Sequence, residues 1–208
     1  MCKSVVGLKW KYNHFVQEFC GIEYKWCGGC DRFVQNTSKF WPKRESSSCK
    51  KCGRMYVLKK HYNLEYGEYL DLIKKCNRRC LICKSDKRLC VDHCHTSGKV
   101  RGILCSTCNS ALGQFKDNIE HMKLAVDYLK NSITDIKYNV TKSKHRKVGQ
   151  TCKITNGDER LVVDHCHKTG FVRGVIQNNI NSGIGLFKED ANLIEKAILY
   201  LSEALCHS

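Results

Sequence analysis

Apolar and polar residues alternate along one stretch in the middle of the chain, and a helical pattern follows it. Leu89 to His93 alternates with a period of two, which predicts a strand, and Val100 to Leu104 is expected to return beside it. Thr96 to Lys99 has the small and polar residues of a turn. From Cys105 the chain is expected to become helical, so the pattern predicts a hairpin followed by a helix.

Helical spacing of apolar residues predicts further helices around this hairpin. One helix is expected within residues 54–79, and another is expected to begin where Asp117 and Glu120 resemble a capping box. Residues 1–24 contain aromatic residues whose spacing allows an amphipathic helix. We interpret that segment as an N-terminal extension or a packing arm.

The chain then repeats itself. Residues 152–190 can be laid over residues 80–118 without a gap, a shift of 72 residues. The shared residues are Asp92, His93, His95, Arg101, Gly102 and Asn109 in the first copy and Asp164, His165, His167, Arg173, Gly174 and Asn181 in the second. Two copies predict a pseudo-symmetric pair of modules rather than a solenoid. The basic stretch between them, residues 132–150, is interpreted as a linker.

The charge of the chain indicates a nucleic-acid partner. Its 208 residues include 36 Lys and Arg against 20 Asp and Glu, a formal net charge of +16. No apolar run approaches the roughly 20 residues that a membrane-spanning helix needs. The first residues are interrupted by charges too early for a secretory signal, so we expect a soluble intracellular protein with no membrane partner.

Cysteines predict two structural zinc sites. Many of the 16 cysteines stand in Cys-x-x-Cys pairs, which favours zinc-bound thiolates over disulfides. The two sets of four are Cys27, Cys30, Cys49 and Cys52, and Cys80, Cys83, Cys105 and Cys108. The first set predicts a zinc ribbon, because its insert is about the length of a hairpin that brings the second pair back to the first. The basic and aromatic residues of that insert are either a phosphate-facing surface or a solvated face.

The second copy lacks most of its zinc ligands. Cys152 matches Cys80, but Thr155, Gln177 and Ile180 stand in the other three positions. Because a structural zinc contributes on the order of 10 kcal/mol of folding free energy, another brace must hold this hairpin. The candidates are an apolar plug and the final helix packed against the first copy, with the residues Ile154, Val175, Ile180, Leu193, Ile194, Ile198 and Leu201.

Polar residues inside the first zinc loop indicate chemistry that a structural loop does not need. The Asp92 carboxylate and the Asn109 amide oxygen are hard ligands suited to Mg²⁺ or Mn²⁺. His93 can take a proton from an attacking water. His95 shares its face of the strand and would support the phosphate, complete the metal shell or pack. The expected contacts to DNA phosphates are Lys99, Arg101 and Arg173.

This arrangement suits cleavage of a phosphodiester bond. The second copy lost three zinc cysteines yet kept Asp164, His165, His167 and Asn181, which makes it a second candidate catalytic site. The sequence leaves open whether that copy is active or a scaffold.

At these residues the chain resembles the recombination endonuclease VII family of phage nucleases, within the wider HNH or ββα-metal fold. The matching run is Cys80-x-x-Cys83, Val91-Asp92-His93-Cys94-His95-x-x-Gly98, Val100-Arg101-Gly102-x-Leu104-Cys105-x-x-Cys108-Asn109 and Leu112-Gly113-x-Phe115. The resemblance implies structural zinc on the four cysteines, a catalytic divalent ion on Asp92 and Asn109, and His93 as general base. The family includes a homodimeric resolvase of branched DNA, and related HNH proteins are homing or nicking endonucleases.

We therefore expect small α+β zinc-stabilised modules: an N-terminal zinc ribbon followed by two tandem ββα-metal (HNH-like) modules with flanking helices. The expected domains are an extension (1–24), the zinc ribbon (25–56), the first module (57–131), the basic linker (132–150) and the second module (151–208). The expected function is a Mg²⁺- or Mn²⁺-dependent DNA endonuclease that prefers branched or distorted DNA. The alternatives are a sequence-specific homing or nicking enzyme and a non-catalytic, zinc-dependent DNA-binding protein. The chain would be a pseudo-two-fold monomer or a homodimer, located in the cytoplasm, or in the host cytoplasm if it is phage-encoded.

Overall fold

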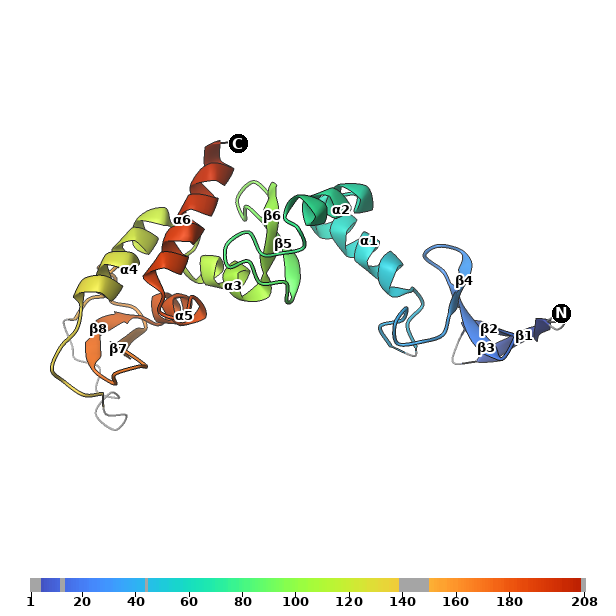
Figure 1. Cartoon of the computed structure of the whole chain (residues 1–208), viewed down its shortest axis with the longest axis horizontal. Coiled ribbons are helices and arrows are strands. Elements are labelled where there is room, and N and C mark those ends of the chain that lie inside the picture. Colours follow the sequence, from blue (N-terminus) through green and yellow to red (C-terminus); the bar gives the residue numbers. More distant parts are fainter. Residues whose placement is uncertain (1–4, 12–13, 44, 139–149, 207–208) are drawn as a thin grey trace. The chain divides into compact units, whose positions relative to one another are not determined.

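The computed structural model describes residues 5–11, 14–43, 45–138 and 150–206 (Figure 1). The chain divides into two compact units, residues 1–71 and residues 72–208, and each is described by itself.

The first unit contains a four-stranded antiparallel sheet with the strands in sequence order. The strands are β1 (Val5–Lys11), β2 (His14–Phe19), β3 (Ile22–Cys27) and β4 (Arg32–Gln35). The described residues of this segment therefore form strands and not the amphipathic helix that the aromatic spacing in residues 1–24 allowed. Cys20 and Gly21 both have positive φ, at 50° and 74°, and make the tight turn between β2 and β3. Trp10 and Phe15 are cross-strand partners with ring centroids 4.8 Å apart, so their spacing reflects strand pairing.

Two helices replace the single helix expected within residues 54–79. They are α1 (Lys50–Tyr62) and α2 (Tyr66–Lys75). α1 ends at Asn63, whose left-handed backbone (φ 47°) directs its N–H to the carbonyl groups of Leu58 and Lys59. Asparagine tolerates this conformation better than most residues, so it stops the helix.

In the second unit, a hairpin followed by two helices occurs twice. The elements are β5 (Leu89–His93), β6 (Val100–Cys105), α3 (Ser106–Gln114), α4 (Ile119–Asn131), β7 (Leu161–His165), β8 (Val172–Gln177), α5 (Asn178–Leu186) and α6 (Ala191–Cys206). The hairpin and the helix expected after it are confirmed. In each hairpin the aspartate faces a glycine across the strands: Asp92 pairs with Gly102, and Asp164 with Gly174. The expected capping role of Asp117 is wrong, because Asn118 caps α4 by accepting a bond from the His121 N–H.

One hydrophobic core joins the two modules of this unit. α4 packs against α6, and α3 packs against α5 (Figure 1). The ring centroids of Phe115 and Phe187 lie 6.3 Å apart at this contact. Gly183 permits it, because a Cβ there would lie 2.7 Å from the Phe115 ring. Of the residues expected to brace the second module, the core includes Ile154, Ile180, Ile194 and Leu201, with Leu193 and Ile198 packed against it. Val175 is only half-buried.

The chain after α4 pairs with the second hairpin, although the sequence placed it in a linker. Thr134 donates its N–H to the Val172 carbonyl, Val172 donates back to Ile136, and Tyr138 donates to Gly170. We call residues 134–138 the strap. Residues 139–149 of the expected linker, with Lys142, Lys144, Arg146 and Lys147, lie outside the described residues.

Candidate functional site

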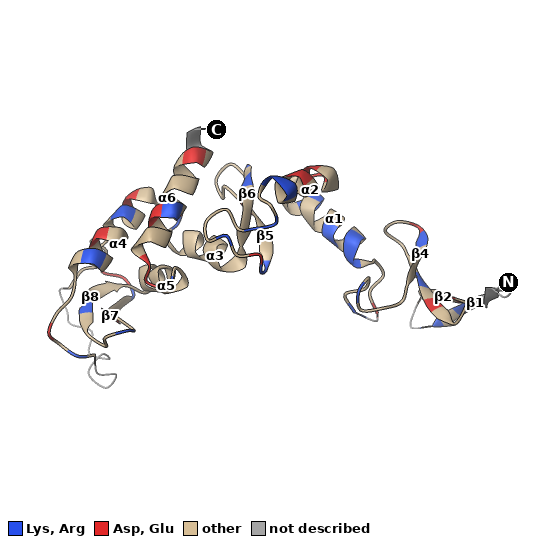
Figure 2. Ribbon diagram, in the orientation of Figure 1, with Lys and Arg blue, Asp and Glu red and all other residues tan. Residues whose placement is uncertain are grey.

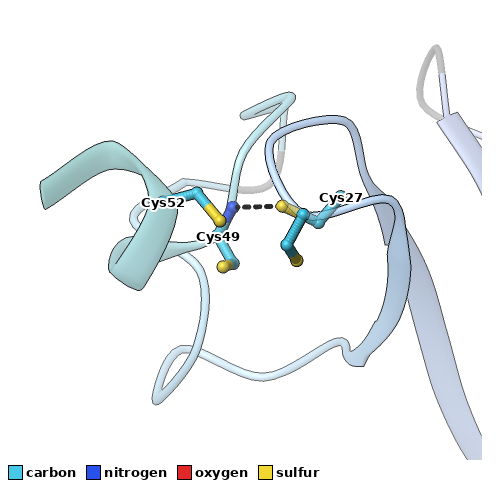
Figure 3. A group of neighbouring side chains, drawn as sticks. Cys27, Cys49 and Cys52 are labelled. Atoms are coloured by element: carbon cyan, nitrogen blue, oxygen red, sulfur yellow. Dashed lines mark hydrogen bonds between the residues drawn. The ribbon is translucent and has the colours of Figure 1, made fainter. Parts of the chain in front are cut away.

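Four cysteines meet in the first unit. Cys27 and Cys30 lie between β3 and β4, while Cys49 and Cys52 lie at the start of α1. Their Sγ atoms all lie within 4.8 Å of one another, and the Cys49 N–H donates to Cys27 Sγ at 3.2 Å (Figure 3). Burial would raise the pKa of the Cys27 thiol, but backbone N–H donors led by that of Cys49 outweigh it and lower the pKa to about 7. This favours the thiolate, the form that binds zinc.

A second cluster of four cysteines lies in the first module. The Sγ atoms of Cys80, Cys83, Cys105 and Cys108 also lie within 4.8 Å of one another. Cys83 Sγ and Cys105 Sγ are 3.6 Å apart. A tetrahedral site with Zn–S bonds of about 2.3 Å has sulfurs about 3.8 Å apart, so the cluster fits structural zinc.

In the second module a hydrogen bond stands where the zinc ligands would be. Thr155 Oγ1 donates to Gln177 Oε1 at 2.6 Å, and Cys152 and Ile180 beside them are fully buried. The Sγ of Cys152 still accepts backbone N–H groups from Ile154, Thr155 and Gln177. The loop has therefore kept the backbone form of a zinc-binding turn while losing three ligands.

The carboxylate of Asp92 on β5 is buried, with 1% of its surface accessible, and accepts three hydrogen bonds. Arg101 Nε donates to Oδ2 at 2.7 Å, and Arg101 Nη2 donates to Oδ1 at 2.9 Å. The hydroxyl of Tyr200, on α6 of the second module, donates to Oδ2 at 2.7 Å. Burial and the adjacent carboxylate raise the pKa of Tyr200 far above its ordinary value, so this hydroxyl remains a donor.

Asp164 on β7 has the equivalent partners. Arg173 donates to both of its oxygens, at 2.7 and 2.9 Å, and the hydroxyl of Tyr128 on α4 donates to Oδ2 at 3.0 Å. Each module thus places a helix tyrosine on the aspartate of the other module.

Each arginine also binds a second acidic residue, and that acidic residue in turn lies beside the second histidine of its module, His95 or His167. Arg101 Nη1 also donates to Asp117, whose Oδ2 is 3.7 Å from His95 Nδ1. Arg173 likewise donates to Glu189, which also bonds His167. Burial would raise the pKa of Glu189, but Arg173 and His167 outweigh it and lower that pKa.

The two histidines proposed as bases have different surroundings. His93 is half-buried at the end of β5, with its ring centroid 4.8 Å from that of His95. His165 at the end of β7 is stacked face to face on Tyr138 of the strap, with centroids 3.9 Å apart and planes 4° apart. Asn109 and Asn181 are half-buried at equivalent positions in the first turns of α3 and α5.

A cavity of about 700 Å³ opens beside the first-module site. Its lining includes His95, Lys99, Arg101 and Asp117, together with Leu201 of α6. Asp117 Oδ1 is buried there without a hydrogen-bond partner in the described part of the chain. The cavity therefore combines cationic, anionic and apolar walls, and it is lined by Arg101, the partner of Asp92, but not by Asp92, His93 or Asn109.

The expected phosphate contacts differ in their placement. Lys99 is exposed, whereas Arg101 and Arg173 are largely covered, with side-chain exposures of 10% and 6%, and bind carboxylates. A phosphate contact by either arginine stays a prediction. Lys and Arg also occur on α1, α4 and α6, so the positive charge is not confined to one element (Figure 2). Within the described residues, no helix is long and apolar enough to cross a membrane.

Comparison with known families matches this duplicated arrangement. The family model for recombination endonuclease VII matches residues 55–131 and again residues 132–203, together more than half of the chain. The chain belongs to the recombination endonuclease VII family. Its internal duplication is confirmed, since the model matches twice.

Two phage proteins are similar to part of this family member. The Gene 59 protein of Mycobacterium phage L5 is 43% identical over 75 residues, which cover 34% of this chain and 46% of that protein. The Gene 59 protein of Mycobacterium phage D29 is 42% identical over 74 residues, covering 33% and 45%. The match thus spans less than half of either relative. No solved structure matches the chain.

Sequence reasoning missed several residues of this endonuclease VII family site. They are Tyr128, Tyr200, Asp117, Glu189 and Tyr138. The first four carried a signal, because the shift of 72 residues also pairs Tyr128 with Tyr200 and Asp117 with Glu189. Tyr138 carried none, since its contact with His165 depends on how the strap folds back onto β8.

Proposed function

We propose that this endonuclease VII family member is a divalent-metal-dependent DNA endonuclease whose reacting residues lie in the first module. The observation that carries the choice of module is the contrast between the two histidine sites. In the second module, the strap bonds Val172 and stacks Tyr138 on His165. In the first module, the equivalent of Val172 is Val100, which lines the cavity. The strap thus covers the second-module site with its own chain, whereas the loop and strand that follow His93 line a cavity.

In the first module, the hydrogen-bond donors to Asp92 leave one position on its carboxylate for a bond to a cation. An ionised carboxylate has about four lone-pair positions, and Arg101 and Tyr200 take three of them. The fourth lies on Oδ1. The side chain of Asn109 makes no hydrogen bond within the described residues. Asp92 and Asn109 would therefore hold Mg²⁺ or Mn²⁺, which supplies positive charge for the phosphate when bound.

His93 would act as the general base, since imidazole can accept a proton from water near neutral pH. His95, held near Asp117, would orient the phosphate from the adjoining loop. Lys99 and Lys116 line the cavity beside it and would contact the DNA backbone. Two basic units in one chain, of net charge +16, support binding to branched or distorted DNA, where more than one duplex arm meets the protein.

Two other functions remain as alternatives. A sequence-specific homing or nicking enzyme would use the same residues on a linear duplex. A non-catalytic, zinc-dependent DNA-binding protein is favoured by one observation, the bidentate Arg101 contact that already neutralises Asp92.

Nicking assays with matched variants test the proposal. The full-length, zinc-loaded chain is incubated with a four-way DNA junction or a linear duplex of the same sequence, with Mg²⁺ or Mn²⁺. We expect nicks at the junction, lost by at least 10²-fold in His93→Ala while zinc content and DNA binding are kept. His165→Ala, the control at the equivalent position, should cut like the wild type.

Each contrary result points to a named alternative. Undiminished cutting by His93→Ala would refute its role as base. Cleavage at one site of the linear duplex would indicate a sequence-specific nickase. DNA binding without cleavage under any divalent ion would identify a non-catalytic binding protein.

A further inference from the structure

Tyr200 crosses from one module to the other to reach the site. It belongs to α6, more than 100 residues beyond Asp92 in the chain, yet its hydroxyl lies 2.7 Å from Asp92 Oδ2. Tyr200 is 9% exposed and Asp92 is 1% exposed, so water does not replace this bond. The second module thus supplies a hydrogen bond to the reacting half of the unit.

The first hairpin leaves a path for the tyrosine. Gly102 faces Asp92 across the strands, and a Cβ on Gly102 would lie 3.3 Å from Tyr200 Oη and 2.7 Å from Leu81 Cδ1. Any larger residue opposite the aspartate would therefore crowd the phenol. Glycine at this position is explained by the approach of Tyr200 and Leu81, since its backbone is ordinary strand.

The hydrogen bond from Tyr200 also determines which oxygen of the Asp92 carboxylate keeps a lone pair for another ligand. Tyr200 and Arg101 Nε both donate to Oδ2, whereas Oδ1 accepts only from Arg101 Nη2. Rotation of the carboxylate would break the Tyr200 bond and one Arg101 bond together. The pair of donors on Oδ2 therefore holds Oδ1, with its remaining lone pair, in one orientation.

We propose that Tyr200 is a positioning residue for the first-module site, and that the second module is the half that completes this site across the interface. The inference rests on the proposed function, because it assigns Asp92 Oδ1 to a divalent ion. We assign this role to Tyr200 and not to Tyr128, its equivalent in the first module. Tyr128 makes the same bond to Asp164, but that bond serves a module whose histidine is covered by Tyr138.

The matched pair Tyr200→Phe and Tyr128→Phe tests the assignment in the full-length, zinc-loaded protein. Each variant removes the tyrosine hydroxyl that donates a hydrogen bond to one buried aspartate. Both variants should therefore lower Tm by a similar few degrees. Mn²⁺ binding is measured by titration calorimetry, with Asp92→Asn to identify the site. Nicking of the junction is measured in parallel as kcat and KM for DNA.

We expect Tyr200→Phe to weaken Mn²⁺ binding or to lower kcat by about 10-fold or more, because partners that orient a metal ligand typically contribute that much. Its KM for DNA should stay within about two-fold. Tyr128→Phe should match the wild type in both measurements. A purely structural role for Tyr200 would instead give the two variants the same profile.

The outcomes separate this inference from the proposed function. If the wild type binds Mn²⁺ through Asp92 but never cuts DNA, the proposed function fails, and the Mn²⁺ affinity of Tyr200→Phe still decides the inference. Wild-type Mn²⁺ affinity and kcat in Tyr200→Phe would overturn it, as would Mn²⁺ binding unaffected by Asp92→Asn. If Tyr200→Phe does not fold, Gly102→Ala displaces the phenol without removing it, and Gly174→Ala against the flexible Lys153 is its control.

Discussion

At the scale of single residues, the same two kinds of side chain, an arginine and a tyrosine, bind each buried carboxylate. Asp92 lies with Arg101 and Tyr200, and Asp164 with Arg173 and a tyrosine of the other module. A buried ion pair adds little net stability, but an unpaired buried charge is costly. The arginines therefore matter to folding whether or not the aspartates bind metal.

Substitution of Arg173 should show this cost in the module that we consider non-catalytic. Arg173→Met leaves Asp164 buried with one hydroxyl donor, so we expect the free energy of unfolding to fall by about 3–5 kcal/mol. Lys130→Met is the control, because Lys130 pairs with Glu195 at the surface, with exposures of 54% and 45%. That loss should be about 0–1 kcal/mol. Urea unfolding of the zinc-loaded proteins gives both values, and equal losses would contradict the argument.

At the scale of elements, sequence patterns predicted those parts that depend on near neighbours. Alternation gave β5 and β6, and Cys-x-x-Cys spacing gave both cysteine clusters. The N-terminal strands were missed because Cys20 and Gly21 carry no Asn-Gly or Asp-Gly turn signal, and an aromatic spacing fits a helix equally well. The hydrogen bond between Thr155 and Gln177 was missed because it joins residues 22 apart, one in a turn and the other at the end of β8.

The second hairpin should accept zinc again if its ligands are restored. We expect Thr155→Cys, Gln177→Cys and Ile180→Cys together to add one zinc per chain. Cys152 remains in place, and the donors to its Sγ, from Ile154, Thr155 and Gln177, are the equivalents of those that surround Cys80. Metal analysis of the purified protein counts the zinc.

The control for this design adds Cys152→Ser to the triple variant and should return the zinc content to that of the wild type. A triple variant that folds but gains no zinc would show that the loop has lost the zinc-binding geometry.

At the scale of the whole molecule, the repeat predicted two modules but not their mutual dependence. The retained residues Asp164, His165 and Asn181 were evidence for a second copy of the site. The structure adds a direct contact between the copies, since α6 of the second copy carries the tyrosine that bonds Asp92. Sequence could not give this, because pairing of α4 with α6 and of α3 with α5 depends on packing between modules.

Because the modules share one core, they should associate without a covalent connection. We expect residues 1–138 and residues 150–208, co-expressed as two chains, to purify as a one-to-one complex. The α3–α5 and α4–α6 contacts, the strap on β8 and the two tyrosine bonds all join one piece to the other. Affinity capture of one piece, followed by size-exclusion chromatography with light scattering, measures the stoichiometry.

Gly183→Leu in the shorter piece is the control. A Cβ at position 183 would lie 2.7 Å from the Phe115 ring, so the larger side chain should separate the two chains. Two folded pieces that never associate would contradict a shared core. That result would also contradict the proposal that the second module completes the site of the first.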